Sequence, residues 1–277
     1  MLELIHASFA EVSELFSAKA EGFELEQFPG YTSDQWGIKA HNRPWVEKYG
    51  NFKSGQKVLE IGGGYSLFPK YLVDKYRLEA WIADDFGKRS EEPLWNRWGD
   101  PDILPKKYPN VRYIFERFGS YSSNLPDSYF DRIFTISTLE HIPIGQRMDV
   151  FKDMHRCLKP GGRQLHTIDL QLPTIREALF QAAGDKVALL RSIFKGAKSE
   201  LFTWINIIEN SGVILKASLP NTIKLLDRGI LVESPDVVYR FYPPNFSPKP
   251  YHPSASLLLI IEKGTGGDRP KSGGFER

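Results

Sequence analysis

The chain has 277 residues, 41% hydrophobic and 25% charged, which is the balance of a soluble globular protein able to bury a sizeable core. Its 36 Lys and Arg against 34 Asp and Glu leave a net charge of +2, too small to indicate nucleic acid or an acidic membrane as a partner. Cys157 is the single cysteine, which excludes an internal disulfide and a cysteine metal cluster. We see no signal peptide and no apolar run long enough to cross a bilayer, so we expect a cytoplasmic protein.

Residues 1–50 predict a helical extension before the main domain. Three polar or aromatic side chains in it, Tyr31, Trp36 and His41, are candidates for a lid over a binding site, with an aromatic packing layer as the equal alternative. The helical prediction rests on apolar residues that recur at helical spacing, at Ile5, Phe9, Val12 and Phe16.

The stretch from Lys57 to Ser66 predicts a buried strand, a glycine-rich turn and the start of a helix. Val58, Leu59 and Ile61 are strand formers, and the three glycines that follow allow a sharp turn and a close backbone approach. Ser66 is a candidate N-cap for the helix after it. A strand, a glycine turn and a helix N-terminus together are typical of a nucleotide site in doubly wound sheets.

The run Glu60-x-Gly62-x-Gly64 closely resembles motif I of the class I S-adenosylmethionine-dependent methyltransferases, of the small-molecule type. The resemblance implies that Glu60 lies near the amino-acid part of the cofactor and that Gly62, Gly63 and Gly64 let it approach. A carboxylate at this strand end suits a cationic ligand better than a pyrophosphate. The family's third glycine falls at Ser66, where this sequence departs from the pattern.

A second acidic feature follows at the expected distance. Residues 78–83 predict the next strand, which ends at Asp84 and Asp85. An acidic residue about 20 residues past such a turn commonly holds ribose hydroxyls. The resemblance carries this role to Asp84, with Asp85 as the alternative.

The third strand is predicted at residues 111–115. In the family, an acidic residue after this strand commonly meets the adenine amino group, but the matching pair here is Gly119-Ser120. Ser120 can still form a hydrogen bond, while Phe118 or Tyr121 could stack on the ring or simply pack within the loop.

The fourth strand is predicted at residues 132–137, and Leu139-Glu140-His141 follows it. This run is a second match to the family, and it implies cofactor contacts from Ser137 and Leu139. His141 is a candidate general base, because the ordinary pKa of histidine lies near neutrality. The alternative is that His141 only orients the loop.

Residues 144–158 carry a helical apolar stripe, which stops at Lys159-Pro160-Gly161-Gly162. Leu-Lys-Pro-Gly-Gly followed by a strand at 163–170 is the third family-typical stretch. That strand carries His166, expected to be a buried core residue, and Asp169, a second catalytic candidate near the strand end. Alternation does not say which face either side chain takes.

The predicted organisation is one domain with five parts. The cofactor-binding core spans 51–170, a helical cap insertion 171–235, final strands 236–263, and a disordered tail 264–277, after the extension at 1–50. Two helices are expected within 175–194 and a third at 201–215, with last strands at 237–241 and 256–261.

The resemblance thus predicts a three-layer, Rossmann-like α/β fold whose sheet is mostly parallel with an antiparallel last strand. It implies an enzyme that uses S-adenosylmethionine to methylate an oxygen or nitrogen of a small or saccharide-like molecule, with no metal, no nucleic acid and no membrane. An inactive cofactor-binding scaffold or partner subunit is the alternative. A nicotinamide-dependent oxidoreductase is disfavoured because Leu67 stands where its last glycine would be. The oligomeric state stays open.

Overall fold

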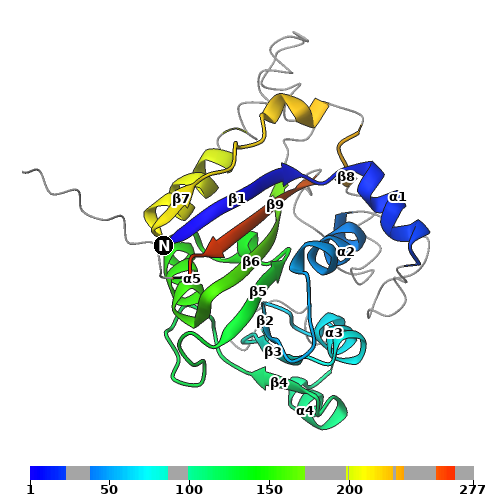
Figure 1. Ribbon diagram of the computed structural model, residues 1–277, viewed down its shortest axis with the longest axis vertical. Coiled ribbons are helices and arrows are strands. Elements are labelled where there is room, and N and C mark those ends of the chain that lie inside the picture. The colour runs from blue at the N-terminus through cyan, green and yellow to red at the C-terminus, as the bar shows by residue number, and fades with distance from the viewer. Residues whose placement is uncertain are drawn as a thin grey trace, which may run out of the picture.

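A computed structural model describes residues 1–22, 38–86, 99–171, 198, 200–226, 229–233 and 254–265. In this part of the chain one nine-stranded sheet runs through the molecule, with helices on both faces (Figure 1). The strand order is β4-β3-β2-β5-β6-β9-β1-β7, and β8 pairs with β9. This is the three-layer α/β architecture that the sequence predicts.

The first half of the sheet is entirely parallel and matches the predicted strands. Each neighbouring pair in the order β4-β3-β2-β5-β6 is parallel, so the carboxyl ends of these strands share one edge. Strand β6 begins earlier than predicted, because the Lys-Pro-Gly-Gly run already belongs to it. The bounds are β2 Lys57–Ile61, β3 Glu79–Ala83, β4 Val111–Ile114, β5 Phe130–Ile136 and β6 Leu158–Gln171.

The second half of the sheet contains the antiparallel strand. Strand β9 runs antiparallel to both β6 and β1, which confirms the predicted antiparallel last strand. Strand β1 lies between β9 and the short strand β7, to which it is parallel. The bounds are β1 Leu2–Phe9, β7 Val213–Leu215, β8 Val232–Glu233 and β9 Ser254–Lys263.

The prediction of an all-helical extension at 1–50 is wrong for its first residues, which form β1. The four apolar positions at helical spacing do not share a buried face, since Ile5 is 38% exposed and Phe16 is 65% exposed while Phe9 is buried. Pairing with β9 along the whole strand overrides the apparent period. Helices follow only at α1 (Val12–Ala20) and α2 (Ile38–Gly50).

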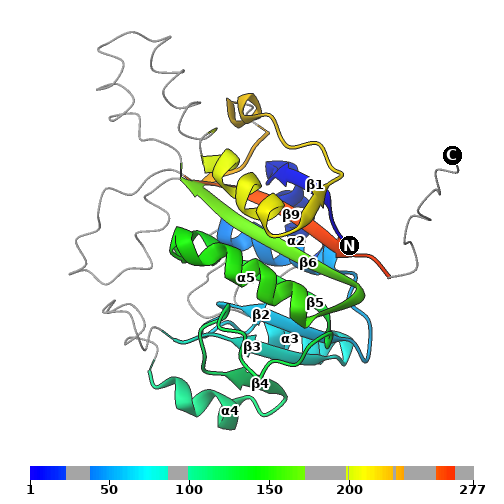
Figure 2. The same ribbon diagram turned by 90° about the vertical axis from the view of Figure 1, so that its left-hand side faces the viewer.

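The helices cover the two faces of the sheet (Figure 2). Helices α2 and α3 lie on one face, and α5 lies on the other together with the helix of residues 200–210. The third cap helix, predicted at 201–215, ends sooner, at residue 210. Gly212 follows with a positive φ of 90°, and the chain continues as β7. The remaining bounds are α3 Phe68–Tyr76, α4 Leu104–Lys107 and α5 Ile144–Cys157, with 3-10 turns at Pro101–Ile103, Leu139–His141 and Thr222–Leu226.

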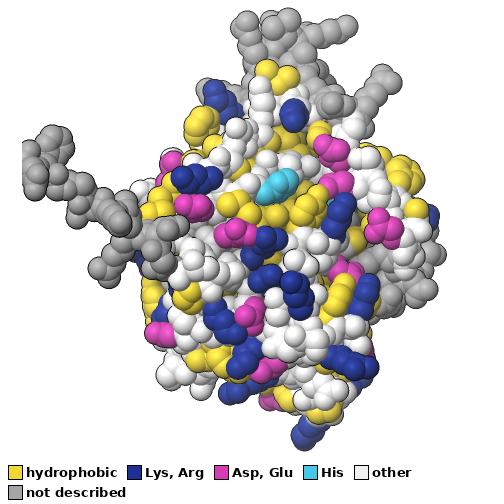
Figure 3. Space-filling view, in the orientation of Figure 1, with side chains coloured by type: hydrophobic (Ala, Val, Ile, Leu, Met, Phe, Trp, Pro, Cys, Tyr) yellow, Lys and Arg dark blue, Asp and Glu magenta, His cyan; other side chains and the backbone are white. Residues whose placement is uncertain are grey.

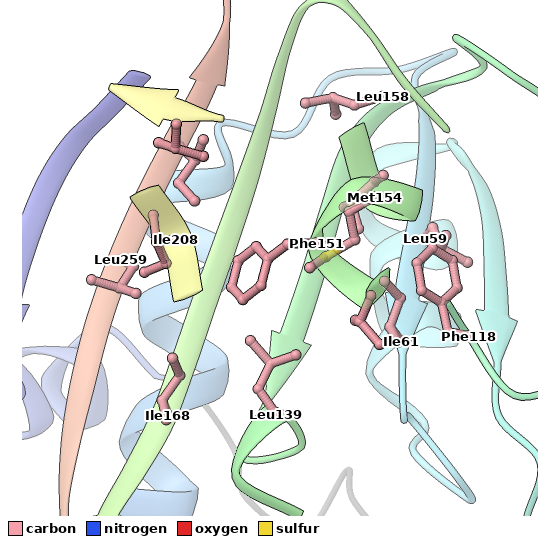
Figure 4. Close-up of a cluster of buried hydrophobic side chains, with 14 of the residues drawn as sticks. Leu59, Ile61, Phe118, Leu139, Phe151, Met154, Leu158, Ile168, Ile208 and Leu259 are labelled. Carbon is pink, nitrogen blue, oxygen red and sulfur yellow. The ribbon is translucent and has the colours of Figure 1, made fainter. Parts of the chain in front are cut away.

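Two hydrophobic clusters hold these layers together, one on each face. Phe151 and Met154 of α5 pack with Leu59, Leu139 and Ile168 on one face, as Figure 4 shows. The cluster on the other face joins α2 and α3 to the sheet through Trp45, Val46, Phe68, Leu72, Val58, Phe134, Leu165 and Leu258. Because side chains alternate along a strand, these clusters also assign each polar strand residue to a face.

Several predicted segments lie outside the described residues. These are the two helices expected within 175–194, the strand at 237–241 and most of the tail from 264 onward. Among the described residues no helix has the length and apolarity needed to cross a membrane, and no group of three or more His, Cys, Asp or Glu side chains is arranged to hold a metal.

Charged side chains of both signs intermingle on the face shown in Figure 3. Ion pairs also join different elements: Lys159 contacts Asp131 at 2.9 Å, and Arg163 pairs with Glu262 of β9. Arg132 and Arg163 also donate to the carbonyls of Gly50 and Tyr49. These two arginines therefore satisfy carbonyl groups at the C-terminal end of α2.

The strand assignment of the first residues is tested by two neighbouring substitutions. Leu4 is fully buried in β1, whereas Ile5 lies at the register shift between Leu4 and His6 and is 38% exposed. Leu4→Ala should therefore destabilise the protein by about 2–5 kcal/mol, and Ile5→Ala by well under half of that. Denaturant unfolding of both variants measures the difference, and equal losses would contradict the strand assignment.

Candidate functional site

The carboxyl ends of β2, β3, β5 and β6 meet at one edge, and the glycine turn after β2 forms its centre. The turn is tied to β3 through its backbone, because Gly62 N donates to Ala83 O at 2.9 Å and Gly64 N donates to Asp84 Oδ2 at 2.7 Å. Gly62 and Gly64 both have positive φ, of 70° and 51°, where a side chain would be strained. The predicted turn is present.

The loop after β5 packs directly on this turn. A Cβ added to Gly62 would lie 2.0 Å from Thr138 Cγ2, so the two loops approach more closely than any side chain permits. Thr138 Oγ1 also donates to Gly62 O at 3.3 Å. The residue before it, Ser137, adopts a positive φ of 48°, which is uncommon outside glycine and often marks functional sites.

Glu60 is buried at 3% exposure beside the turn, on the face covered by α2 and α3. Burial raises the pKa of its carboxyl to about 7, opposed by the nearby Arg43 guanidinium and a hydrogen bond with Ser66. Its Oε2 has no hydrogen-bond partner within the described part of the chain. A buried carboxylate oxygen without a partner fits a cationic group, which is what motif I implies for the amino-acid end of S-adenosylmethionine.

Asp84 and Asp85 follow β3 beside the turn. Asp84 accepts two backbone N–H bonds, from Gly64 at 2.7 Å on Oδ2 and from Phe86 at 2.6 Å on Oδ1. Burial nevertheless raises the pKa of the Asp84 carboxyl to about 6. Asp84 therefore orders the glycine turn itself, and each oxygen retains acceptor capacity for a ribose hydroxyl.

The loop after β4 forms a small hollow of about 140 Å³. Ser120 lines it, although its Oγ donates to Arg117 O at 2.9 Å. The buried Asp153 of α5 fixes this loop by accepting from the backbone N–H groups of Gly119 and Tyr121, at 3.1 Å and 3.2 Å. Asp149 also lines the hollow, so an acidic group does stand beside Ser120, though it comes from α5.

Of the two candidate residues after β5, Leu139 lies in the hydrophobic core and His141 lies on the surface. Leu139 is fully buried in the α5 cluster (Figure 4), so only its backbone is left to meet a cofactor. The side chain of His141 is 74% exposed, with Nε2 3.9 Å from Glu140 Oε1. Glu140 is the buried member of this pair, at 7% exposure.

Asp169 lies at the end of β6 within a buried polar network. It is 6% exposed, and its Oδ1 accepts from Ser137 Oγ at 2.9 Å. Ser137 Oγ in turn accepts from Asn42 Nδ2 at 3.1 Å, and Ser256 Oγ donates to Asn42 Oδ1 at 2.9 Å. The network thus joins α2, the loop after β5, β6 and β9.

His166, the other β6 residue considered from the sequence, points to the opposite face. Its ring packs against Phe151 at 5.4 Å, and its two nitrogens lie 3.0 Å from Thr135 Oγ1 and 3.1 Å from Gln164 Oε1. Burial lowers the pKa of His166 to about 3. It is a neutral, satisfied core histidine, in agreement with the expectation.

Helix α2 supplies two residues to the site that sequence reasoning missed. Asn42 enters the polar network, and Arg43 acts on the charge of Glu60. No local sequence pattern marks either residue, because Asn42 bonds Ser137, 95 residues away. His41 itself is buried and bonds Glu14 of α1 at 3.1 Å, so it ties α1 to α2; Tyr31 and Trp36 lie outside the described residues.

A larger cleft of about 390 Å³ lies between α1, α2 and α3. Its lining includes His41, Glu47 and Lys75 but none of the residues predicted to bind the cofactor. Glu47 there accepts from three donors, the hydroxyls of Tyr71 and Tyr76 and the ammonium of Lys75. These bonds connect α2 to α3.

Comparison with known proteins agrees with this geometry. Residues 59–165 match the model of a family described as a methyltransferase domain. The curated phosphoethanolamine N-methyltransferase 2 of Caenorhabditis elegans is 25% identical over 123 residues, which cover 44% of this chain and 26% of that protein. The chain therefore spans only about a quarter of that relative's length.

Two solved structures are similar at low identity. A protein of Galdieria sulphuraria, provisionally named a sarcosine dimethylglycine methyltransferase, aligns with a TM-score of 0.44 and 15% identity over 91% of this chain and 98% of its own. Phosphoethanolamine N-methyltransferase 2 of Haemonchus contortus, solved with phosphomonomethylethanolamine and S-adenosylhomocysteine, aligns with a TM-score of 0.41 and 15% identity, over 80% of this chain and 52% of its own.

Residues 59–165, less than half of the chain, match a methyltransferase domain, and this stretch contains the glycine turn and the parallel strands β3, β2 and β5 around it. The match agrees with the resemblance seen in the sequence, with its Rossmann-like fold and with S-adenosylmethionine as the cofactor that motif I implies.

The close contact at the turn predicts a strong effect of adding one methyl group. Gly62→Ala should destabilise the protein by more than about 2 kcal/mol, because the new Cβ meets Thr138 and sits at positive φ. Thr138→Ser removes Cγ2 and should restore part of the loss. Gly145→Ala is the matched control, since nothing lies within 4 Å of its added Cβ. Thermal or denaturant unfolding reads out all three variants, and equal stability of the two alanine variants would contradict the contact.

The raised pKa of Glu60 predicts that cofactor binding depends on pH. Because its ionised form suits a cationic group, affinity for S-adenosylmethionine should fall as pH drops below about 7, by roughly tenfold between about pH 8 and pH 6. Calorimetry in two buffers of different ionisation enthalpy should show proton release on binding near pH 7. The pKa of Asp84 is raised to about 6, so Asp84 also changes its charge in this pH range. Glu60→Gln separates the two contributions: this variant should bind S-adenosylmethionine more weakly, and its affinity should depend less on pH.

The same shift has the opposite consequence for the protein without cofactor. A carboxyl whose pKa is raised by folding stabilises the fold when protonated, so its contribution is complete below about pH 4.5 and is lost as pH rises to about 7. Glu60→Gln should therefore be at least as stable as the wild type at neutral pH. A loss of stability in this variant would show that the ionised carboxylate supports the fold.

Proposed function

We propose that the protein transfers the methyl group of S-adenosylmethionine to a nitrogen or oxygen atom of a small molecule. The observation that carries this proposal is the convergence of the glycine turn, the unpartnered Glu60 Oε2 and the Asp84 carboxylate at one sheet edge. The sulfonium supplies an activated methyl group when the cofactor is bound, so the protein's task is mainly binding and alignment.

Each part of the edge has a distinct role in this proposal. Glu60 would bind the cationic amino-acid end, and Asp84, with Asp85 as the alternative, would accept from the ribose hydroxyls. The hollow beside Ser120, with Asp149 in its lining, is a candidate for the adenine contact. Ser137 and the backbone of Leu139 would border the methyl group at the end of β5.

Two candidates remain for a residue that holds or removes a proton of the acceptor. Asp169 is buried at the strand end and fixed by Ser137, whereas the His141 side chain is 74% exposed. A proton acceptor works best where its position is fixed and water is excluded. This favours Asp169 as the acceptor-side carboxylate, with His141 on the rim.

A small amine is the first acceptor to try. The curated relative and the Haemonchus structure are named as phosphoethanolamine N-methyltransferases, and carboxylates such as Asp169 and Glu140 accept bonds from N–H groups. A hydroxyl acceptor is the second candidate, since it would also donate to Asp169.

The proposal is tested by binding and by transfer. Calorimetry should show binding of S-adenosylmethionine and not of NADH, and incubation with phosphoethanolamine, glycine, sarcosine or their hydroxyl analogues should yield S-adenosylhomocysteine. Asp169→Asn should lower turnover by about 10²–10⁴-fold if it handles the proton, and His141→Ala should have a smaller effect.

Three results would contradict it in different ways. Absence of cofactor binding would exclude the methyltransferase function, and NADH binding would favour an oxidoreductase. Cofactor binding without transfer to any acceptor, including a metabolite extract, would support the inactive scaffold. A large loss in His141→Ala with normal turnover in Asp169→Asn would reverse the two roles.

A further inference from the structure

We propose that Ser256, Asn42 and Ser137 form a directed hydrogen-bond chain that positions the Asp169 carboxylate at the acceptor side of the cofactor site. These three are positioning residues, because they act through Asp169. The inference rests on the proposed function, and it adds an essential contribution of α2 and β9, outside the residues 59–165 that match the methyltransferase family.

The bonds of this positioning chain all run in one direction. Ser256 Oγ donates to Asn42 Oδ1 at 2.9 Å, and Asn42 Nδ2 donates to Ser137 Oγ at 3.1 Å. Ser137 Oγ then uses its own proton to donate to Asp169 Oδ1 at 2.9 Å. Each donor is thereby polarised by the one behind it, and the chain ends on an oxygen that can only accept.

Burial makes this arrangement rigid. Asn42 and Ser256 are fully buried, and Asp169 is 6% exposed. Removal of one member would leave a neighbour with an unsatisfied polar group out of reach of water, which is costly. Because the Asn42 amide presents its donor to Ser137, the Ser137 hydroxyl keeps its own proton for the bond to Asp169.

The sheet gives the chain its geometry. Asp169 pairs in register with Ser256 across β6 and β9, and both side chains lie on the α2 face. The backbone of Ser137 is fixed to β6, because its N–H donates to Thr167 O at 2.9 Å. Ser137 has a positive φ of 48°. The strained backbone at Ser137 is therefore fixed on both sides, which is expected where a side chain must be aimed.

The same loop connects Asp169 to the cofactor turn. Thr138 follows Ser137 directly and packs on Gly62, so the residue that orients Asp169 adjoins the residue that contacts the turn. A carboxylate fixed at this point can accept from an N–H or O–H group of the acceptor. It also adds negative charge where a positively charged methyl donor is expected.

The test uses a cofactor analogue and needs no acceptor. Sinefungin carries an amine in place of the methyl sulfonium of S-adenosylmethionine, so it presents N–H donors at the transfer point. S-Adenosylhomocysteine lacks that group. Calorimetry gives the dissociation constants of sinefungin and S-adenosylhomocysteine, and their ratio is the preference for sinefungin. The wild type should bind sinefungin more tightly than S-adenosylhomocysteine. Asp169→Asn and Ser137→Ala should each reduce this preference by roughly tenfold.

A double-mutant cycle separates positioning from general stability. If Ser137 acts through Asp169, the double variant should lose no more preference than Asp169→Asn alone. Ser256→Ala, a mild change at the far end, should give a smaller loss. The matched control is Ser211→Ala, because Ser211 is a buried serine whose Oγ donates to Ile208 O within its own helix end. This variant should show the same preference for sinefungin as the wild type.

These binding experiments distinguish a failure of the proposed methyltransferase function from a failure of the inference about Asp169. Binding of neither ligand to the wild type would contradict the proposed function. Normal binding of S-adenosylhomocysteine with an unchanged preference in Asp169→Asn would overturn the inference alone. Additive losses in the double variant, or a loss in Asp169→Asn without one in Ser137→Ala and Ser256→Ala, would show that Asp169 is not positioned by this chain.

Discussion

The site depends on how closely two loops approach each other, the glycine turn after β2 and the loop after β5. Thr138 occupies the space that a Cβ of Gly62 would need, so the glycine is required by the protein's own packing before any ligand is considered. The turn is held from the other side by Asp84, which accepts from its backbone. The cofactor site is therefore built in advance by contacts between three adjacent strand ends.

Helix α2 links the two ends of this site. Arg43 influences the charge of Glu60 at one end, while the neighbouring Asn42 bonds Ser137 at the other. At its C-terminal end the helix is held by Arg132 and Arg163, which donate to its last carbonyls. Consecutive residues of one helix thus act on Glu60 and on the hydrogen-bond network of Asp169, and a shift of the helix would change both.

The sequence predicts the parallel half of the sheet well, because buried strands, glycine turns and the helix stop before Pro160 are local signals. It fails at β1, where spacing alone suggested a helix and a long-range pairing with β9 decides the structure. The residues of motif I could be recognised from their order. Asn42 could not, because its partners Ser137 and Ser256 are 95 and 214 residues away and no local pattern joins them.

The pairing of β1 with β9 has a consequence for how the protein is made. During translation β1 leaves the ribosome long before its partner β9, and its other neighbour β7 also follows late. At about 5–20 residues per second, β1 waits many seconds with an unpaired backbone and apolar side chains such as Leu4 and Phe9 uncovered. The nascent chain is therefore expected to need chaperone protection at β1 until β9 has been synthesised.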